Sequence, residues 1–312
     1  MQLNQAQIAV LIPCRNEEKT IGSVIKSFQS ELPLAKIYVY DNLSEDKTSD
    51  IAKKNGAIVG HVSQVGKGNV VKRMFSEIEA EIYIMVDGDG TYDSKVVNNL
   101  ISELTEKKLD MVIGARTTKD IQENSRGGHL IGNWMLTKSV SFIFGRGFND
   151  MLSGYRVMTK PFVKSFPVES EGFEIETELT IHSLQLGSQF KEVYTNYYPR
   201  PEGSNSKLST WRDGFKILFK ILSLFKNLKP LMFYSLIFFL MLSLSLILVY
   251  PVLDTWLQTG LVPRLPTAIL SMGIVLVGII SLILGIILES ISQSRLENKK
   301  LIYQVFKSFK SY

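Results

Sequence analysis

The 312-residue sequence is poor in the side chains that most often form disulfides or bind zinc, with one cysteine and three histidines. A single thiol, Cys14, excludes a scaffold of intrachain disulfides and any thiolate-rich zinc or iron–sulfur site. His61, His129 and His182 follow no zinc-ligand spacing. Any metal is therefore expected to be held by carboxylate oxygens, which suit Mg²⁺ or Mn²⁺.

Two glycine-rich phosphate-binding signatures are also missing. No G-x-G-x-x-G run follows the first apolar segment, Ile8–Pro13, as a dinucleotide-binding domain would require. The run Gly66-Lys67-Gly68 lacks the upstream glycine and the Ser or Thr of a P-loop. These absences weigh against a dehydrogenase and against a P-loop nucleoside triphosphatase.

Charge is absent from two long stretches, Leu231–Tyr250 and Ala268–Leu288. At about 1.5 Å of rise per residue, each is long enough as a helix to cross the roughly 30 Å hydrocarbon core of a bilayer. Buried core helices are the alternative, but they would need more surrounding protein than the short remainder of the chain provides. The sequence therefore predicts two transmembrane helices.

The net charge of +5 is concentrated beside these two stretches. Basic residues precede the first and follow the second: Lys216, Lys220, Lys226, Lys229, Arg295, Lys299, Lys300, Lys307 and Lys310. The positive-inside rule places both flanks in the cytoplasm, and the polar residues Met1–Gln7 do not resemble a signal peptide. We expect a multi-pass protein of the plasma (inner) membrane with its N-terminal domain and both termini cytoplasmic. Nucleic acid is not needed as a partner to explain the charge.

The chain is predicted to have four parts. Residues 1–210 form a cytoplasmic domain, residues 211–229 an amphipathic interfacial helix, residues 230–290 a two-helix transmembrane region and residues 291–312 a basic cytoplasmic tail. In the second part, Phe215, Leu218 and Leu222 recur at helical spacing with lysines on the opposite face. An amphipathic helix packed on the soluble domain is the alternative for this segment.

Strand and helix patterns alternate along the N-terminal domain. Strands are predicted at Ile8–Pro13, Lys36–Asp41, Ala57–Val62, Glu81–Val86 and Met111–Ala115, and helices at Glu17–Leu32, Ser44–Lys54 with Ser44 as N-cap, Gly66–Glu79 and Ser94–Lys107. This alternation predicts an α/β fold with a mostly parallel sheet and helices on both faces. Ligands bind such sheets beyond the carboxyl ends of the strands, where this chain carries polar residues.

The run Asp87-Gly88-Asp89 follows a predicted buried strand. Two carboxylates one residue apart repel each other, and a hard divalent cation bound with diphosphate oxygens would relieve this repulsion. A lone Asp-x-Asp run is often only a surface turn. Its position at a strand end favours a metal site.

A wider set of motifs carries a resemblance to a known family. The segments are Ile12–Glu17, Asp41–Thr48, Gly66–Gly68, Val86–Asp89, Gly114–Arg116, Ser153–Arg156, Gly172–Leu179 and Ser206–Leu208. In this order they resemble glycosyltransferase family 2, in its polyprenyl-phosphate glycosyltransferase (dolichol-phosphate mannose synthase-like) branch. The resemblance covers about residues 8 to 225.

The resemblance implies a GT-A fold and the inverting transfer of one sugar from a nucleotide-sugar to a polyprenyl phosphate. By position in the motifs, the donor nucleotide would be held by Pro13, Asn16, Glu17, Asp41, Lys67 and Asp87. The metal, Mg²⁺ or Mn²⁺, would be held by Asp87, Asp89 and Thr91, with Asp89, Arg116 and Arg156 as the catalytic groups. The sugar or the acceptor phosphate would be bound by Glu176, Arg200, Ser206 and Lys207.

Two positions depart from the family pattern. Thr91 stands where mannose synthases commonly have a glutamine, and Asn42 stands where many members have a second aspartate. A threonine can still reach a metal through its hydroxyl group or a water. Asn42 and the run Ser204–Leu208 favour a uridine donor over a guanosine donor, with an N-acetylhexosamine or a hexose as the sugar.

The physical chemistry of the acceptor agrees with this interpretation. A phosphate monoester is already an anion at neutral pH, so the enzyme needs cations to bring two anions together more than it needs a general base. The alternatives are a GDP-mannose-using dolichol-phosphate mannose synthase, a processive polysaccharide synthase and a non-catalytic membrane scaffold. The Gln-x-x-Arg-Trp segment typical of polysaccharide synthases is absent. A homo-oligomer is plausible from the resemblance alone.

Overall fold

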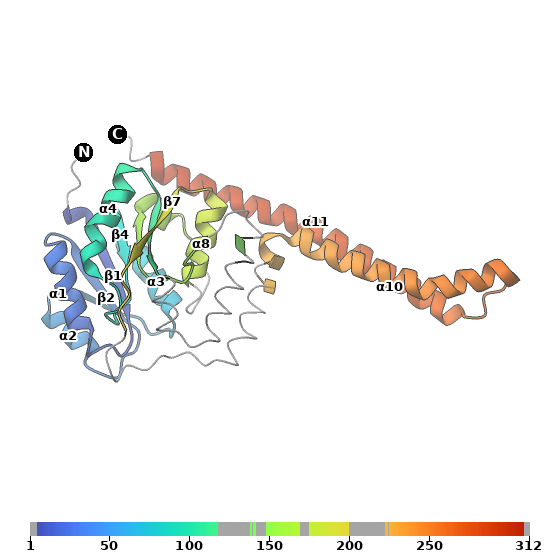
Figure 1. The fold of residues 1–312 in the computed structure, drawn as a ribbon, viewed down its shortest axis with the longest axis horizontal. Helices are drawn as coiled ribbons and strands as arrows, with labels where there is room; N and C mark the ends of the chain where they lie inside the picture. The colour runs from blue at the N-terminus through green and yellow to red at the C-terminus, as the bar shows by residue number, and fades with distance from the viewer. Residues whose placement is uncertain are drawn as a thin grey trace. The chain divides into compact units, whose positions relative to one another are not determined.

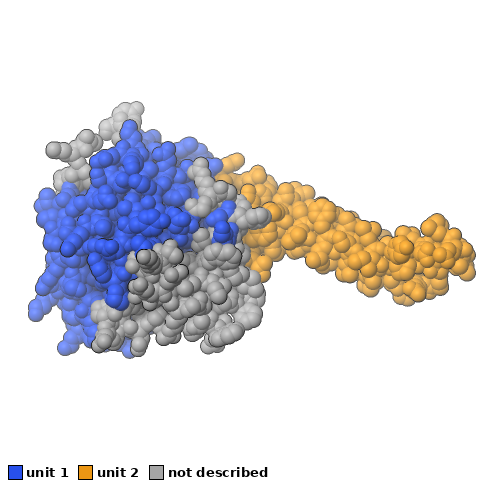
Figure 2. Space-filling model, viewed as in Figure 1, with its two compact units in different colours: residues 1–214, 298–312 blue, residues 215–297 orange. Residues whose placement is uncertain are grey.

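The computed structural model describes residues 5–117, 138, 140–141, 148–168, 175–199, 222–223 and 225–308. The chain divides into two compact units (Figures 1 and 2). Unit 1 contains residues 1–214 and 298–312, and unit 2 contains residues 215–297. Unit 1 is thus built from both ends of the chain.

Unit 1 is organised around a seven-stranded sheet with the strand order β3-β2-β1-β4-β6-β5-β7. The strands are β1 (Ile8–Cys14), β2 (Lys36–Asp41), β3 (Ile58–His61), β4 (Ile82–Met85), β5 (Met111–Arg116), β6 (Arg156–Thr159) and β7 (Phe190–Thr195). All the pairings are parallel except those of β6 with β4 and β5. The predicted α/β fold with a mostly parallel sheet is confirmed.

Helices cover both faces of the sheet (Figure 1). They are α1 (Ile21–Glu31), α2 (Thr48–Lys54), α3 (Lys67–Glu77), α4 (Val97–Glu106), α7 (Lys160–Lys164) and α8 (Ile175–Leu186), with short 3₁₀ turns at η1 (Gln5–Gln7) and η2 (Ser94–Val96). The apolar stripes of α1 and α4 pack with Val10 and Ile12 of β1 in one core cluster. Helix α3 instead contacts α7 and α8. The alternation of side chains along each buried strand thus gives the sheet two apolar faces.

The predicted helix over Ser44–Lys54 begins later than expected, at Thr48. Ser44 does not cap the helix, because its hydroxyl and amide groups donate to the carboxylate of Asp41. Asp46 accepts hydrogen bonds from the amide and the hydroxyl of Thr48 at 3.0 and 2.5 Å. Residues 44–47 are therefore a loop held by side chains at the end of β2, which a periodicity argument cannot distinguish from a first helical turn.

The last residues of helix α11 (Leu265–Ser308) belong to unit 1 and contact other elements of that unit. The hydroxyl of Tyr303 donates to Asp110 Oδ1 at 2.6 Å, and Lys299 Nζ donates to Gln185 Oε1 at 3.2 Å. Asp110 is buried and also accepts from the amide of Gln189 at 3.0 Å, where β7 begins. The sequence predicted only a basic tail over residues 291–312, and its charge pattern carried no sign of these contacts.

Unit 2 contains helix α10 (Pro230–Thr259) and the rest of α11. Both helices are long and apolar enough to cross a membrane, and most of their apolar segments are not buried within the protein. Large side chains such as Leu236, Ile247 and Leu257 are more than half exposed. A core helix of a soluble protein would cover such side chains, so this pattern fits contact with lipid. The two predicted apolar helices are confirmed.

Small residues line the contact between the two helices of unit 2. Ser271, Gly278 and Gly285 are buried on α11 and recur every two turns. Ser245 of α10 donates its hydroxyl to the carbonyl of Ser271 at 2.9 Å. A Cβ added at Gly285 would lie 2.8 Å from Cβ of Tyr234. Small residues let the backbones approach closely, as helix pairs in membranes require.

We expect the Gly285→Ala variant to lose about 1–3 kcal/mol of helix-pair stability, because the added methyl group has no room beside Tyr234. The measurement is the midpoint of denaturant-induced unfolding of the full chain in detergent. Gly273→Ala is the matched control, since no heavy atom lies within 4 Å of its added Cβ. Equal midpoints for the two variants would contradict this packing.

Candidate active site

The loops after β1 and β2 are held together by reciprocal hydrogen bonds. Asn16 has a positive φ of 54°, its amide donates to Ser44 Oγ at 2.8 Å, and its side-chain oxygen accepts from the amide of Glu45 at 2.8 Å. The amide of Glu17 donates to Thr48 Oγ1 at 2.8 Å. In the structure the side-chain oxygen of Asn16 orders the loop, and its expected role in binding the donor stays a prediction. Asparagine tolerates this left-handed conformation better than most residues.

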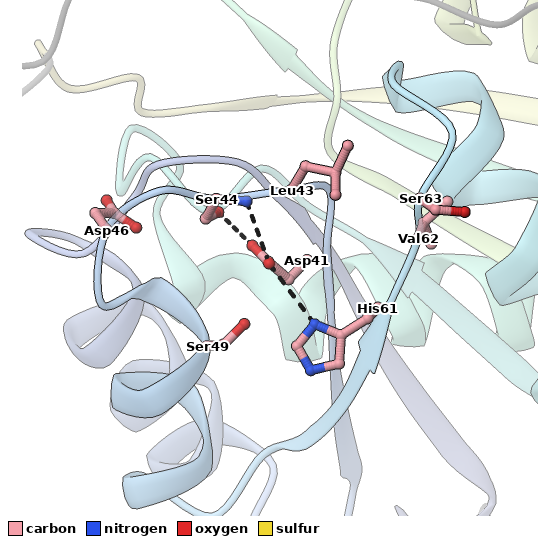
Figure 3. Close-up of a pocket in the computed structure, with 8 residues that line it drawn as sticks. All are labelled: Asp41, Leu43, Ser44, Asp46, Ser49, His61, Val62 and Ser63. Carbon is pink, nitrogen blue, oxygen red and sulfur yellow. Dashed lines mark hydrogen bonds and ion pairs between the residues drawn. The ribbon is translucent and has the colours of Figure 1, made fainter.

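A pocket of about 460 Å³ opens beside these loops (Figure 3). It is lined by Asp41, Leu43, Ser44, Asp46, Ser49, His61, Val62 and Ser63. Asp41 is the last residue of β2, and its carboxylate accepts from Ser44 and lies 3.7 Å from Nδ1 of His61. The carboxylates and hydroxyl groups of the pocket can therefore accept hydrogen bonds from a ligand. Sequence reasoning identified Asp41 but missed His61, which ends the neighbouring strand β3 opposite Asp41.

Asn42 is buried and holds the loop that leads into helix α3. Its side-chain amide donates to the carbonyls of Val62 and Gln64 at 3.0 and 2.7 Å, and its side-chain oxygen accepts from the amide of Gly66 at 2.7 Å. An aspartate could not donate to these carbonyls. The departure from the family pattern at this position is therefore structural, since it fixes the loop that delivers Lys67.

Lys67, the first residue of α3, brings two carboxylates together. Its Nζ lies 2.5 Å from Asp87 Oδ1 and 2.5 Å from Glu176 Oε1. The side chains of Lys67 and Glu176 are 9% and 6% exposed, whereas that of Asp87 is 30% exposed. Burial opposes the charge on Lys67, but the two carboxylates outweigh it and raise the pKa of Lys67. The structure thus joins Lys67, Asp87 and Glu176, which the sequence had placed in the site separately.

Two glycines make room for the Asp-x-Asp run. A Cβ at Gly88 would lie 2.5 Å from Sγ of Cys14, and a Cβ at Gly154 would lie very close to a carboxylate oxygen of Asp87 and 2.9 Å from its Cγ. Burial raises the pKa of the Cys14 thiol, so this thiol is a packing group and not a nucleophile. The amide of Gly154 donates to the hydroxyl of Tyr92 at 2.8 Å, a contact that sequence reasoning missed.

Asp89 is 3% exposed and is oriented by Thr91. The hydroxyl of Thr91 donates to Asp89 Oδ1 at 2.7 Å, and its amide is 3.2 Å from the same oxygen. Thr91 is 1% exposed, and its hydroxyl proton is directed at Asp89. In the structure Thr91 therefore orients the carboxylate of Asp89, and its expected role as a metal ligand stays a prediction.

Among the described residues, Arg116 and Arg156 are both engaged by groups of the protein itself. Arg116 forms a bidentate pair with Asp150, with both N–O distances at 2.8 Å, and its guanidinium group lies 5.3 Å from the ring centre of Tyr197. Arg156 is 0% exposed and donates to the carbonyls of Met151 and Ser153. Burial lowers the pKa of Arg156 to about 10, which leaves it charged at neutral pH.

These contacts engage both guanidinium groups, and the catalytic roles expected for the two arginines stay predictions. Arg156 also donates to Thr180 Oγ1 at 3.0 Å, and so ties the Ser153–Gly154 turn to α8, which carries Glu176. Sequence reasoning missed Asp150, because its pairing with Arg116 spans 34 residues and leaves no local pattern. Arg200, Ser206 and Lys207 lie outside the described residues.

The donor set at the Asp-x-Asp run fits a hard divalent cation that is completed by a ligand. Asp87 and Asp89 supply carboxylate oxygens, the donors that Mg²⁺ and Mn²⁺ prefer. Among the described residues there is no group of three or more His, Cys, Asp or Glu side chains placed to hold a metal ion. The protein alone would leave coordination positions open, as a site that also binds diphosphate oxygens requires.

The fold and this carboxylate site define the chain as a GT-A-type glycosyltransferase. Residues 9–164 match the family model "Glycosyl transferase family 2", and the chain belongs to this family. It is similar to glycosyltransferase AglJ of Haloferax volcanii, with 32% identity over 299 residues that cover 96% of this chain and 98% of the relative. A dolichyl-phosphate hexose transferase of the same organism is 26% identical and covers 67% of this chain and 90% of its own length.

Solved structures share the fold. Glucosyl-3-phosphoglycerate synthase from Mycobacterium tuberculosis, in complex with Mn²⁺, uridine diphosphate and phosphoglyceric acid, has a TM-score of 0.54 and 24% identity. The match covers 69% of this chain and 78% of that chain. At this identity the likeness establishes the fold.

We expect the Asn42→Asp variant to lose about 1–3 kcal/mol of stability, because one buried and one part-buried carbonyl lose their donor and face a carboxylate. The midpoint of thermal or denaturant-induced unfolding measures this loss. Asn69→Asp is the matched control, since its side chain donates to the carbonyl of Val65 from an exposed position. An equal loss of stability in both variants would contradict the role of Asn42 in holding the loop.

We expect Gly154→Ala to lower kcat/KM for a nucleotide-sugar by about 10–100-fold, because the methyl group would displace the carboxylate of Asp87. Steady-state kinetics measure this effect, and circular dichroism verifies that the fold is retained. Wild-type kinetics in a folded variant would show that the position of Asp87 does not matter.

Proposed function

We propose that the protein transfers one sugar from a UDP-sugar to a polyprenyl phosphate with inversion at the anomeric carbon. The carrying observation is a carboxylate site at the strand ends in the same chain as two membrane-length apolar helices. The similarity to a dolichyl-phosphate hexose transferase supports a lipid phosphate acceptor. The likeness in fold to an enzyme solved with Mn²⁺ and uridine diphosphate is consistent with a uridine donor. The sugar is an N-acetylhexosamine or a hexose.

The donor nucleoside occupies the pocket at Asp41, where carboxylate and hydroxyl oxygens accept from the base and the ribose. Pro13 and Glu17, at and just after the end of β1, complete this side of the site. Asp87 and Asp89 would hold a divalent cation, which would supply positive charge to the diphosphate. Lys67 and Glu176 lie beside Asp87, where the diphosphate and the sugar meet.

The transfer itself needs no proton movement. An oxygen of the lipid phosphate forms a bond to the anomeric carbon while the bond from that carbon to the diphosphate oxygen breaks. Both the nucleophile and the leaving group are anions, so the protein contributes mainly orientation and positive charge. Arg200, Ser206 and Lys207 are proposed to bind the acceptor phosphate.

The membrane position follows from the same proposal. Helices α10 and α11 span the plasma membrane, and the flanking lysines keep unit 1 and both termini in the cytoplasm. The predicted interfacial helix over residues 211–229, most of which lie outside the described residues, is proposed to lie on the cytoplasmic leaflet. A polyprenyl phosphate presents its headgroup at this leaflet.

The test is a panel assay with the purified full chain, undecaprenyl phosphate, Mg²⁺ or Mn²⁺, and each common UDP- and GDP-sugar in turn. We expect one UDP-sugar to give a glycolipid carrying a single sugar, with activity lost on chelation of the cation. Asp89→Asn should lower kcat by about 10²-fold or more, a loss of the size seen when charge stabilisation is removed. Asp50→Asn, an exposed aspartate in α2, is the control and should retain wild-type activity.

Other results would select the alternatives. Turnover of GDP-mannose in place of every UDP-sugar would identify a mannose synthase, and a product that lengthens with time would identify a polysaccharide synthase. Failure of the protein to bind any nucleotide in calorimetry with the cation present would indicate a scaffold.

A further inference from the structure

The contact of Lys67 with Asp87 and Glu176 joins three separate segments. Lys67 begins α3, Asp87 follows β4, and Glu176 lies in the first turn of α8. Both N–O distances are 2.5 Å. Two carboxylates and one ammonium leave this cluster with one net negative charge. We refer to these three residues as the lysine cluster.

Stability of the fold alone does not explain the lysine cluster. Charges removed from water lose hydration energy that their mutual attraction seldom exceeds, and apolar side chains of similar size often stabilise a fold as well. The cluster is also uneven, since Lys67 and Glu176 are almost fully covered while Asp87 is 30% exposed. The open side of the cluster is therefore the carboxylate that belongs to the Asp-x-Asp run.

We propose that the ammonium group of Lys67 neutralises Asp87 in the donor-free enzyme. When the donor and a divalent cation bind, Lys67 leaves Asp87 and pairs with the donor diphosphate. Glu176 is the positioning residue that keeps Lys67 beside the site during this exchange. The inference rests on the proposed function and deepens it, because it assigns the diphosphate as the new partner of Lys67.

The charges explain why the exchange would couple the two ligands. Asp89 adds a further negative charge next to the lysine cluster, whereas Arg116 is already paired with Asp150. A divalent cation arriving alone competes with Lys67 for Asp87. When a nucleoside diphosphate arrives with it, Lys67 gains phosphate oxygens as partners, so the competition ends. Each ligand then raises the affinity of the other by the same factor.

The experiment measures Mn²⁺ binding to the full chain in detergent by the electron paramagnetic resonance signal of free Mn²⁺, without and with UDP. For the wild type we expect UDP to tighten Mn²⁺ binding by about tenfold or more, within the range usual for coupled sites. For Lys67→Met we expect Mn²⁺ alone to bind about tenfold tighter than to the wild type, because Asp87 and Glu176 lose their cation. In this variant UDP should tighten Mn²⁺ binding only slightly further.

Two further variants make the result decisive. Lys67→Gln retains hydrogen-bond donors for both carboxylates without the charge, and it should change Mn²⁺ binding in the same direction if Lys67→Met does not fold. Lys164→Met is the matched control, since Lys164 is also largely buried and pairs with Glu79 away from the lysine cluster. It should bind Mn²⁺ like the wild type.

The outcomes separate the two proposals. If Mn²⁺ alone binds to the folded Lys67 variants as in the wild type, or more weakly, Lys67 is only a structural ion-pair partner and the exchange is wrong. If the wild type binds Mn²⁺ and UDP independently of each other, the exchange is also wrong. If the wild type does not bind UDP under any condition, the proposed function itself fails.

Discussion

The site depends on one electrostatic constraint: three carboxylates, Asp87, Asp89 and Glu176, are held at one end of a buried sheet, and among the described residues Lys67 pairs with two of them. Lys67 neutralises part of this charge. The position of Lys67 depends on the loop that Asn42 holds. Gly154 packs closely against Asp87 and leaves no space there for a larger side chain. A site with excess negative charge binds an anionic substrate only together with cations.

Much of the fold follows from local pattern. The strands from Lys36 and from Met111 were predicted from their apolar runs, and the two membrane-length helices from their lack of charge, because burial on both faces and contact with lipid each impose a continuous apolar signal. The Asp-x-Asp run was found for a similar reason, since it directly follows a buried strand.

The roles of the arginines could not be predicted in this way. Arg116 and Arg156 are basic residues in motifs that resemble the family pattern, and a sequence does not show which cations are already paired inside the protein. Asp150 takes up Arg116 across a long separation, and backbone carbonyls take up Arg156. The predicted start of α2 was wrong for a related reason, because Asp41 binds the Ser44 hydroxyl that would otherwise cap the helix.

The contact between Tyr303 and Asp110 has a consequence for how the protein is made. Unit 1 includes residues 298–312, so its last part is synthesised after both apolar helices. The sheet can form as its strands leave the ribosome, but Asp110 lacks its phenolic partner until the end of the chain arrives. Synthesis of the apolar helices therefore precedes completion of unit 1, and a fragment that ends before α10 would lack the last part of this unit.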